Sequence, residues 1–159
     1  MTSNTSNFKK GLDAYNKGDF ATALKEWKPL AEQGDAGAQY NLGVMYERGN
    51  GVPQDYKEAV YWYRLAAEQE HAKAQYNLGV MYNNGNGIPQ DYEEAVRWYQ
   101  LAAEQGHSKA QGNLGVMYAF GNGVIKDYVY AHMWGNIASM NGNDKGGSLR
   151  GYVAENMTS

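Results

Sequence analysis

Apolar residues follow a helical spacing along most of the chain. Between residues 36 and 48, four of them fall within one narrow arc of a helical wheel: Ala38, Leu42, Met45 and Tyr46. The loop Gly49-Asn50-Gly51 follows, and glycine adopts left-handed backbone angles at little cost. The pattern therefore predicts a first helix from about Ala36 to Arg48, with that arc buried.

A second helix is predicted after Pro53. Asp55 stands at its cap position and Glu58 follows three residues later, a spacing that satisfies free backbone N–H groups. This helix ends near Gln69. The arc that must meet the first helix consists of Tyr56, Ala59, Val60, Tyr63, Ala66 and Ala67.

The two predicted helices form a unit that recurs along the chain. Residues 36–71 and 72–107 are identical at 28 of 36 positions. The segment AQYNLGVMY at 38–46 returns unchanged at 74–82, and at 110–118 with Gly112 in place of tyrosine. Such a period indicates a stacked array, so we predict an all-α solenoid of about four helix-turn-helix repeats. Three tryptophans 36 residues apart are expected to seal one repeat against the next: Trp62, Trp98 and Trp134.

The ends of the array differ from its middle, as terminal repeats usually do. We predict a disordered leader over 1–7 and a shorter first repeat over 8–35. Regular repeats follow at 36–71 and 72–107, and a divergent one at 108–143. A C-terminal capping segment covers 144–159, with a short helix near Ser148–Met157.

Composition narrows the class of protein. The 159 residues carry a net charge of −3 and no run of Lys or Arg, which argues against nucleic-acid binding. No segment approaches the ~18 apolar residues of a bilayer span, so membrane insertion is not expected. The absence of cysteine excludes disulfides, thiol catalysis and thiolate metal sites. Fourteen tyrosines are many for this length.

The repeated unit resembles the Sel1-like repeat, a relative of the tetratricopeptide repeat with a longer loop between its helices. The first unit, from Phe8 to Tyr15, looks more like a tetratricopeptide repeat. The resemblance covers roughly Phe8 to Asn141. In the second regular unit it rests on Ala74, Leu78, Gly79, Tyr82, Gly85, Gly87, Asp91, Tyr92, Ala95, Trp98, Tyr99, Ala102 and Ala103.

The resemblance implies a right-handed superhelix that holds a partner on its concave surface. It also implies adaptor or scaffold work in bacterial envelopes and signalling complexes, without catalysis. Relatives often carry an export signal and continue into a final helix, so bacterial cytoplasm and periplasm both stay open and a truncated C-terminus is expected. Some cysteine-rich relatives have been linked to β-lactam binding, but this chain lacks their disulfide framework.

The candidate partner-binding surface is the face of each first helix that lies opposite its buried stripe. Three of the eight differences between the two regular repeats fall here, at positions 37/73, 47/83 and 48/84. Apolar residues rimmed by variable polar ones are typical of a surface that binds a protein or peptide. The predicted site residues are Phe8, Leu12, Tyr15, Asn16, Tyr40, Val44, Glu47, Arg48, Lys73, Tyr76, Val80, Asn83, Asn84, Lys109, Val116 and Phe120.

Two alternatives remain open on this face. Tyr40 and Tyr76 either line a groove or only pack against the adjacent repeat. Asn41, Asn77 and Asn113 either clamp a peptide backbone or tie neighbouring helices together.

Enzymatic and metal chemistry find little support. The chain contains no Gly-x-Ser-x-Gly, and Gly-Asn-Gly follows a helix without the Gly-Lys-Ser/Thr ending of a phosphate loop. His71 and His107 are repeat-equivalent, so stacking holds them about 10 Å apart and away from His132. We therefore expect no catalytic residue, no metal and no cofactor.

The sequence thus favours a non-catalytic scaffold that binds a peptide or a partner's helix. The first alternative is self-assembly into a homo-oligomer through an open C-terminal end, which residues 142–159 would close by folding back over Trp134 and Met140. A weaker alternative is a glycan or small-molecule binding module, because aromatic rings suit sugar stacking.

Overall fold

The computed structural model describes residues 3–158, and within them nine α-helices and no strand. The helices are α1 (Asn4–Asn16), α2 (Phe20–Glu32), α3 (Ala36–Arg48), α4 (Tyr56–Glu68), α5 (Ala72–Asn84), α6 (Tyr92–Glu104), α7 (Ser108–Phe120), α8 (Tyr128–Met140) and α9 (Asp144–Met157).

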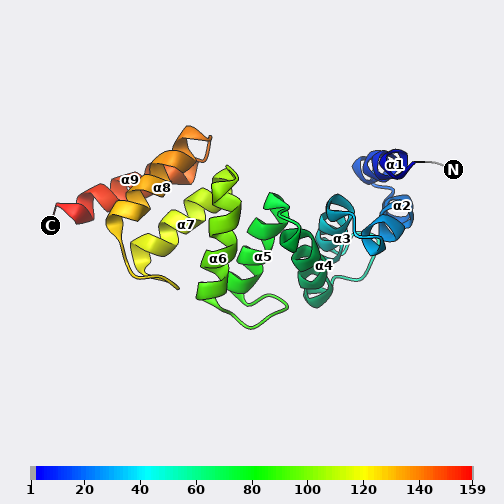
Figure 1. Cartoon of the computed structure of the whole chain (residues 1–159), viewed down its shortest axis with the longest axis horizontal. Helices are drawn as coiled ribbons and strands as arrows, with labels where there is room; N and C mark the ends of the chain where they lie inside the picture. Colours follow the sequence, from blue (N-terminus) through cyan, green and yellow to red (C-terminus); the bar gives the residue numbers. More distant parts are fainter. Residues whose placement is uncertain (1–2, 159) are drawn as a thin grey trace.

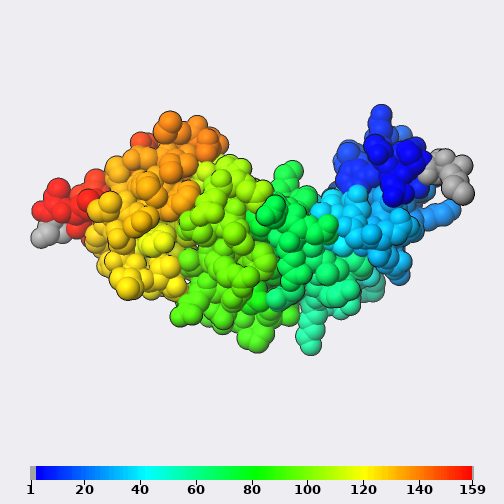
Figure 2. All heavy atoms as spheres, in the orientation of Figure 1, coloured from blue at the N-terminus to red at the C-terminus, as the bar shows by residue number. Residues whose placement is uncertain are grey.

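Consecutive helices pair, and the pairs stack along one long axis, with the two ends of the chain at opposite ends of the stack (Figure 1). The stack is bowed. The turns that join α4 to α5 and α6 to α7 lie along its hollowed edge, and the longer loop between α5 and α6 lies on the opposite edge. Figure 2 shows the same bow in all atoms, hollowed between α1 and α8. The predicted all-helical solenoid is confirmed.

Cap residues set the limits of the helices. Asp35 accepts a hydrogen bond from the N–H of Ala38 at 2.8 Å and so begins α3. Gly49, in the left-handed region with a φ of 69°, ends it. Asp55 accepts from the N–H of Glu58 at 3.2 Å and begins α4. Side-chain caps and left-handed glycines recur 36 residues apart, with His71 and His107 in place of Asp35, so the helix limits agree with those expected from the sequence.

The core of each unit lies between its first and second helix. The predicted stripe of α3 is buried except for Tyr46, which is half-buried. Close approach depends on glycine: a Cβ on Gly43 would lie 2.5 Å from the ring of Tyr63, and one on Gly79 would lie 2.7 Å from that of Tyr99. A fully buried tyrosine ring therefore packs directly on the backbone of the facing helix.

Two predictions about α4 have different outcomes. Tyr56 does not share the buried arc but is 39% exposed, because it stands in the first turn, where its hydroxyl accepts a hydrogen bond from the Gln54 amide at 3.4 Å. Trp62 is buried in one cluster with Trp27 and Leu30 of the first unit, so it seals α4 against the preceding repeat as predicted.

A ladder of buried amides joins the units. The Gln75 side chain donates from Nε2 to the carbonyl of Ala67 at 3.2 Å, and its Oε1 accepts from Gln105 Nε2 at 2.7 Å. The first helix of each unit is thereby bonded to the helix before it and to the turn that ends its own unit. Equivalent bonds are made by Gln39 and Gln111.

The N-terminal end corrects the predicted disordered leader. Residues 1 and 2 lie outside the described residues, but Asn4–Asn7 form the first turn of α1. The reason is a helix cap that begins before the repeat pattern: the Ser3 hydroxyl accepts a hydrogen bond from the N–H of Ser6 at 3.2 Å.

The C-terminal helix α9 begins at Asp144 rather than near Ser148, because Asn143 caps it. Its residues Leu149 and Val153 are buried against α7 and α8. Leu149 fills the space that a tyrosine ring fills in the central units, since position 135 is glycine. The helix thus covers one side of the last pair, while Met140 stays 86% exposed.

Candidate partner-binding groove

Tyrosines from the first helices of the two regular repeats lie at the junctions between units. The Tyr40 ring stacks on that of His71 with centroids 4.9 Å apart, and Tyr76 stacks on His107 at 4.6 Å. Each histidine is the cap of the next first helix, so each ring pair bridges two repeats. Both tyrosines are half-buried: one ring face packs, as the packing alternative required, and part of each side chain stays accessible.

The environment of these ring pairs shifts their protonation. Burial raises the pKa of Tyr40 and Tyr76 above the usual value, so both hydroxyls stay protonated at neutral pH. Burial lowers the pKa of His71 and His107, and the neighbouring Lys73 and Lys109 ammonium groups add to this effect. Neutral imidazoles suit their role, because each Nδ1 accepts a hydrogen bond from the N–H of the third residue of its helix, Ala74 or Ala110.

The asparagines of the first helices connect one repeat to the next. The Asn77 side chain interacts with the hydroxyls of Tyr40 and Tyr63, which belong to the preceding unit. Asn113 does the same with Tyr76 and Tyr99. Of the two roles left open by the sequence, inter-helix tying therefore has a structural basis.

An apolar hollow lies at the N-terminal part of the groove. It has a volume of about 390 Å³ and opens between α1, α3 and the start of α5. Phe8, Leu12 and Tyr40 supply most of its apolar wall, and Lys73 stands as its single ionised side chain. The lining is completed by Gly37, Asn41, His71 and Ala72.

Two adjoining hollows form the C-terminal part of the groove. The larger, of about 510 Å³, lies where α5, α7 and α9 meet; the smaller, of about 280 Å³, extends along α5 and α7. Tyr76, Asn113 and Lys145 line both. The larger is also lined by Ser108, Lys109, Gly142, Asn143 and Asp144, and the smaller by Val80, Asn83, Asn84, Tyr99, Val116 and Met117.

The structure thus brings together ten of the sixteen predicted site residues around these hollows. They are Phe8, Leu12, Tyr40 and Lys73 at the N-terminal hollow, and Tyr76, Val80, Asn83, Asn84, Lys109 and Val116 at the C-terminal ones.

Six predicted residues lie elsewhere, and three of them have structural partners. The Tyr15 hydroxyl accepts a hydrogen bond from the Asn50 amide at 3.0 Å. Glu47 accepts one from the hydroxyl of Tyr63. The Phe120 ring stacks on Tyr152 of α9 at 5.3 Å. The other three are Asn16 and Arg48, exposed at helix ends, and Val44, half-buried against the core.

Sequence reasoning missed the contribution of α9. Lys145 follows Lys109 by the repeat spacing of 36, as Lys109 follows Lys73. That spacing was available in the sequence, but the repeat pattern had dissolved by residue 142. The helical start of α9, which places Asn143 and Asp144 beside α7, emerges only in the structure.

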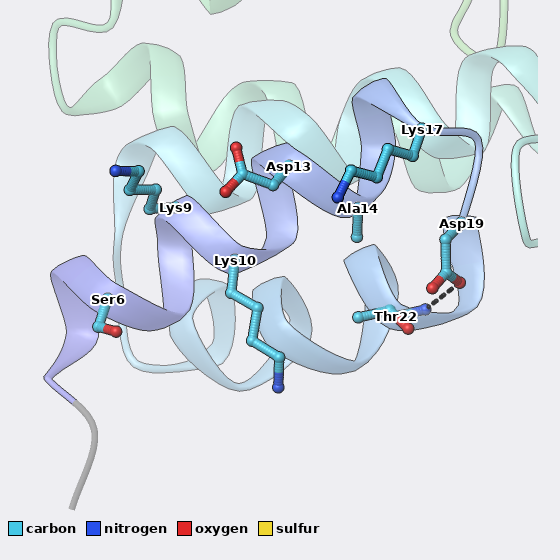
Figure 3. A pocket seen from close by; sticks show the side chains of 8 residues that line it. All are labelled: Ser6, Lys9, Lys10, Asp13, Ala14, Lys17, Asp19 and Thr22. Atoms are coloured by element: carbon cyan, nitrogen blue, oxygen red, sulfur yellow. Dashed lines mark hydrogen bonds between the residues drawn. The ribbon is translucent and has the colours of Figure 1, made fainter.

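A further hollow of about 440 Å³ lies between α1 and α2, at the N-terminal end (Figure 3). Two of its five charged side chains already have structural partners: Lys10 pairs with Glu26 at 2.7 Å, and Asp19 caps α2 through the N–H of Thr22. In Figure 3 the side chains of Lys9 and Lys10 diverge rather than point to a common centre. We do not assign a site to it.

Within residues 3–158, no three His, Asp or Glu side chains gather as a metal site would need. Over the same residues, no helix combines the length and the apolar character required to cross a bilayer.

The chain belongs to the Sel1 repeat family. The family's repeat matches three times, at 36–71, 72–107 and 108–143, which are the ranges that the 36-residue period defines. Members of this family are repeat scaffolds of the α-solenoid type, typically interaction modules.

Solved bacterial structures share the fold. A protective antigen of uropathogenic Escherichia coli is 42% identical with a TM-score of 0.85, over 89% of this chain and 31% of the antigen. A Sel1 repeat protein from Oxalobacter formigenes is 36% identical with a TM-score of 0.85, over 89% of this chain and 58% of that protein. Cysteine-rich protein B of Helicobacter pylori is 20% identical with a TM-score of 0.64, over 82% of this chain and 94% of that one, and shows the fold alone.

Curated relatives match over a shorter stretch. The DAP3-binding cell death enhancer 1 of Rattus norvegicus is 36% identical over 50 residues, and that of Mus musculus is 34% identical. The match spans 31% of this chain and 10% of either relative.

Proposed function

We propose that the chain is a non-catalytic protein-interaction module that binds an extended or helical segment of a partner protein. The observation that carries this proposal is the row of hollows along α3, α5 and α7, lined by half-buried tyrosines, asparagines and lysines. Half-buried tyrosine rings offer contact area at low entropic cost, and amides reach a peptide backbone. The two rodent relatives are named as DAP3-binding, which agrees with a binding role.

Leu12 offers the sharpest test of this groove. It lines the N-terminal hollow, is 41% exposed and belongs to none of the buried core clusters. Leu12→Arg should therefore leave folding intact while placing a charge in the apolar hollow. The control is Tyr61→Arg, because Tyr61 is also exposed but lies on α4 outside all the hollows.

The experiment measures binding of the labelled chain to an array of random-sequence decapeptides. We expect a set of peptides that the parent and the Tyr61→Arg variant bind equally and the Leu12→Arg variant loses. Equal binding by both variants would place the site outside the groove.

A second candidate function, self-association, is favoured by the surface of α8. Val129, Tyr130 and Met133 are exposed there, where α4 carries Lys57 and Glu58 at the first two equivalent positions. Exposed apolar groups in place of charges are typical of an interface. Sedimentation equilibrium of the parent and of a Val129→Lys/Met133→Lys variant tests this, since a monomeric parent would rule it out.

A further inference from the structure

We propose that the hollow between α5, α7 and α9 binds a carboxylate of the partner segment, from an acidic side chain or a free C-terminus. This inference rests on the proposed function, because it names the chemistry that one part of the groove selects. Three observations support it. The repeat at 108–143 lacks a ring pair, the charges around the hollow are mainly positive, and the N-terminal hollow has a different lining.

The junction between α7 and α9, called the third junction, lacks the tyrosine–histidine ring pair. Such a pair fills the junction between α3 and α5 and the one between α5 and α7. Gly112 stands where Tyr40 and Tyr76 stand in the regular repeats, and Asn143 stands where His107 caps the preceding helix. A Cβ on Gly112 would lie 3.0 Å from Asn143 Nδ2, so a single amide closes the junction on this side.

The Asn143 amide is itself held in place. It donates a hydrogen bond to the carbonyl of Ser108 at 2.9 Å, and its Oδ1 accepts the N–H of Lys145 at 2.9 Å. A single fixed amide thus stands where the other junctions hold two stacked rings. Asn143 also lines the larger hollow of about 510 Å³, which opens beside this junction.

The charge around the gap is mainly positive. Lys109 and Lys145 both line it, and neither has an ion-pair partner: across residues 3–158 the two ion pairs are Lys10–Glu26 and Arg97–Glu94. The N-termini of α7 and α9 add partial positive charge. One carboxylate, that of Asp144, also lines the hollow and leaves the lysines in excess.

Polar donors and an aromatic wall complete a carboxylate site. The hydroxyl of Ser108 lines the hollow and can donate to a carboxylate oxygen, while the Asn113 side chain, which interacts with the hydroxyls of Tyr76 and Tyr99, holds the adjoining wall in place. The ring of Tyr76 forms the wall towards α5 and suits the methylene groups of an acidic side chain. Charge-assisted hydrogen bonds of this kind are roughly twice as strong as neutral ones.

The N-terminal hollow selects differently. Its wall of Phe8, Leu12 and Tyr40 is apolar, and Lys73 is its single charge. A segment that fills both ends of the groove therefore needs an apolar side chain near α1 and a carboxylate near α9. This contrast gives the bound segment a direction along the solenoid.

The experiment begins with the peptides that the parent chain retains from the random-sequence decapeptide array. Each is resynthesised with glutamine or asparagine in place of its acidic residues, and separately with an amidated C-terminus. Fluorescence anisotropy then gives the dissociation constants. We expect loss of the carboxylate to weaken binding about tenfold or more. The two arms show whether the carboxylate comes from a side chain or from the C-terminus.

Two variants of the chain test the site itself. Lys109→Gln/Lys145→Gln removes the charges and should weaken binding of the acidic peptides by about tenfold. Its control, Lys25→Gln/Lys28→Gln, makes the same charge change on exposed positions of α2 and should leave binding unchanged. Gly112→Tyr/Asn143→His restores the ring pair of the other junctions and should abolish acidic-peptide binding while the chain melts no lower than the parent.

The outcomes separate this inference from the proposed function. Peptides that lose binding in Leu12→Arg but tolerate carboxylate removal and the lysine substitutions would overturn the carboxylate site and leave the groove standing. A chain that retains no peptide would overturn both.

Discussion

Two consecutive repeats, 72–107 (called the second below) and 108–143 (the third), are built on the same backbone plan but close their junctions in different ways. Where α5 meets α7, Tyr76 stacks on His107; where α7 meets α9, Gly112 and Asn143 occupy those positions. The amide ladder nevertheless continues, because Gln111 accepts a hydrogen bond from Asn141 at 2.9 Å. The amide ladder is therefore present at every junction between these repeats. The tyrosine–histidine pair is not, so its presence changes the lining of the groove from one junction to the next.

The same lesson holds inside the units. In the second repeat the ring of Tyr99 packs on Gly79, whereas in the third the corresponding glycine, Gly115, receives Leu149 from α9. A rigid ring from the same unit has been replaced by a flexible side chain from the next helix. The third repeat thus depends on α9 in a way that the second does not depend on its neighbours.

The largest effect is expected at the ladder. Gln75→Leu leaves the buried carbonyl of Ala67 and the amide of Gln105 without a partner, at a cost of about 3 kcal/mol of unfolding free energy. Urea denaturation of the variant measures this loss. The control is Gln90→Leu, where an exposed bond to the carbonyl of Asn83 is lost and less than about 1 kcal/mol is expected. Equal losses in the two variants would show that burial of the ladder contributes nothing.

A pair of glycine substitutions separates the rigid contact from the flexible one. Gly79→Ala drives a methyl group into the buried Tyr99 ring and should cost about 2 kcal/mol. Gly115→Ala meets the flexible end of the Leu149 side chain and, at 3.2 Å, the carbonyl of Ala131; because alanine favours the helix, we expect a loss below about 1 kcal/mol. Thermal melts of both variants give the comparison. A larger loss for Gly115→Ala would reverse our view of which junction is rigid.

Restoring the ring pair should stabilise the third junction slightly. Gly112→Tyr/Asn143→His adds one tyrosine–histidine stack of the kind seen at Tyr76 and His107, worth about 0.5–1 kcal/mol. Differential scanning calorimetry against the parent measures it. A destabilised double variant would mean that the backbone of α9 is set for the hollow rather than for the rings.

The smallest expected effect is a pH dependence that belongs to the regular repeats. Burial holds the pKa of His71 and His107 below their usual 6.5 in the folded chain. The unfolded chain therefore takes up protons first as the pH falls through 6.5, and folding stability decreases. Because the rings are half-exposed and solvent screens them, the loss should stay below about 1 kcal/mol.

Melting temperatures between pH 7.5 and 5.5 test this prediction. The control is His71→Asn/His107→Asn, which installs at both junctions the cap residue that Asn143 provides for α9. This variant should melt with a flatter pH profile than the parent across that range. Identical profiles would assign the pH dependence to other groups.

Much of the fold was predictable because it depends on short stretches of sequence. The spacing of apolar residues, the aspartate caps and the Gly-rich loops recur every 36 residues, and they set the helix limits of α3 to α8 within one residue or so. Tyr56 and Asn4–Asn7 were misjudged, since helical angles alone do not show whether a first turn is covered or where an unrepeated cap begins.

The candidate groove was predictable in part. Its first-helix residues followed from the face that helix pairing leaves unused. The partners of Tyr15, Glu47 and Phe120 did not, because they come from a loop, from the facing helix and from α9.

The sequence by itself determined the repeat, its two helices and the side of each helix that is buried, because these depend on the order of residues within one turn or loop. Tertiary structure decided which polar side chains have hydrogen-bond partners and where hollows remain between the helices. The larger hollow is formed where α9 packs across α7 and brings Asn143 and Lys145 close to Tyr76 of α5. A gap between three helices is a property of their packing, and a single chain position cannot encode it.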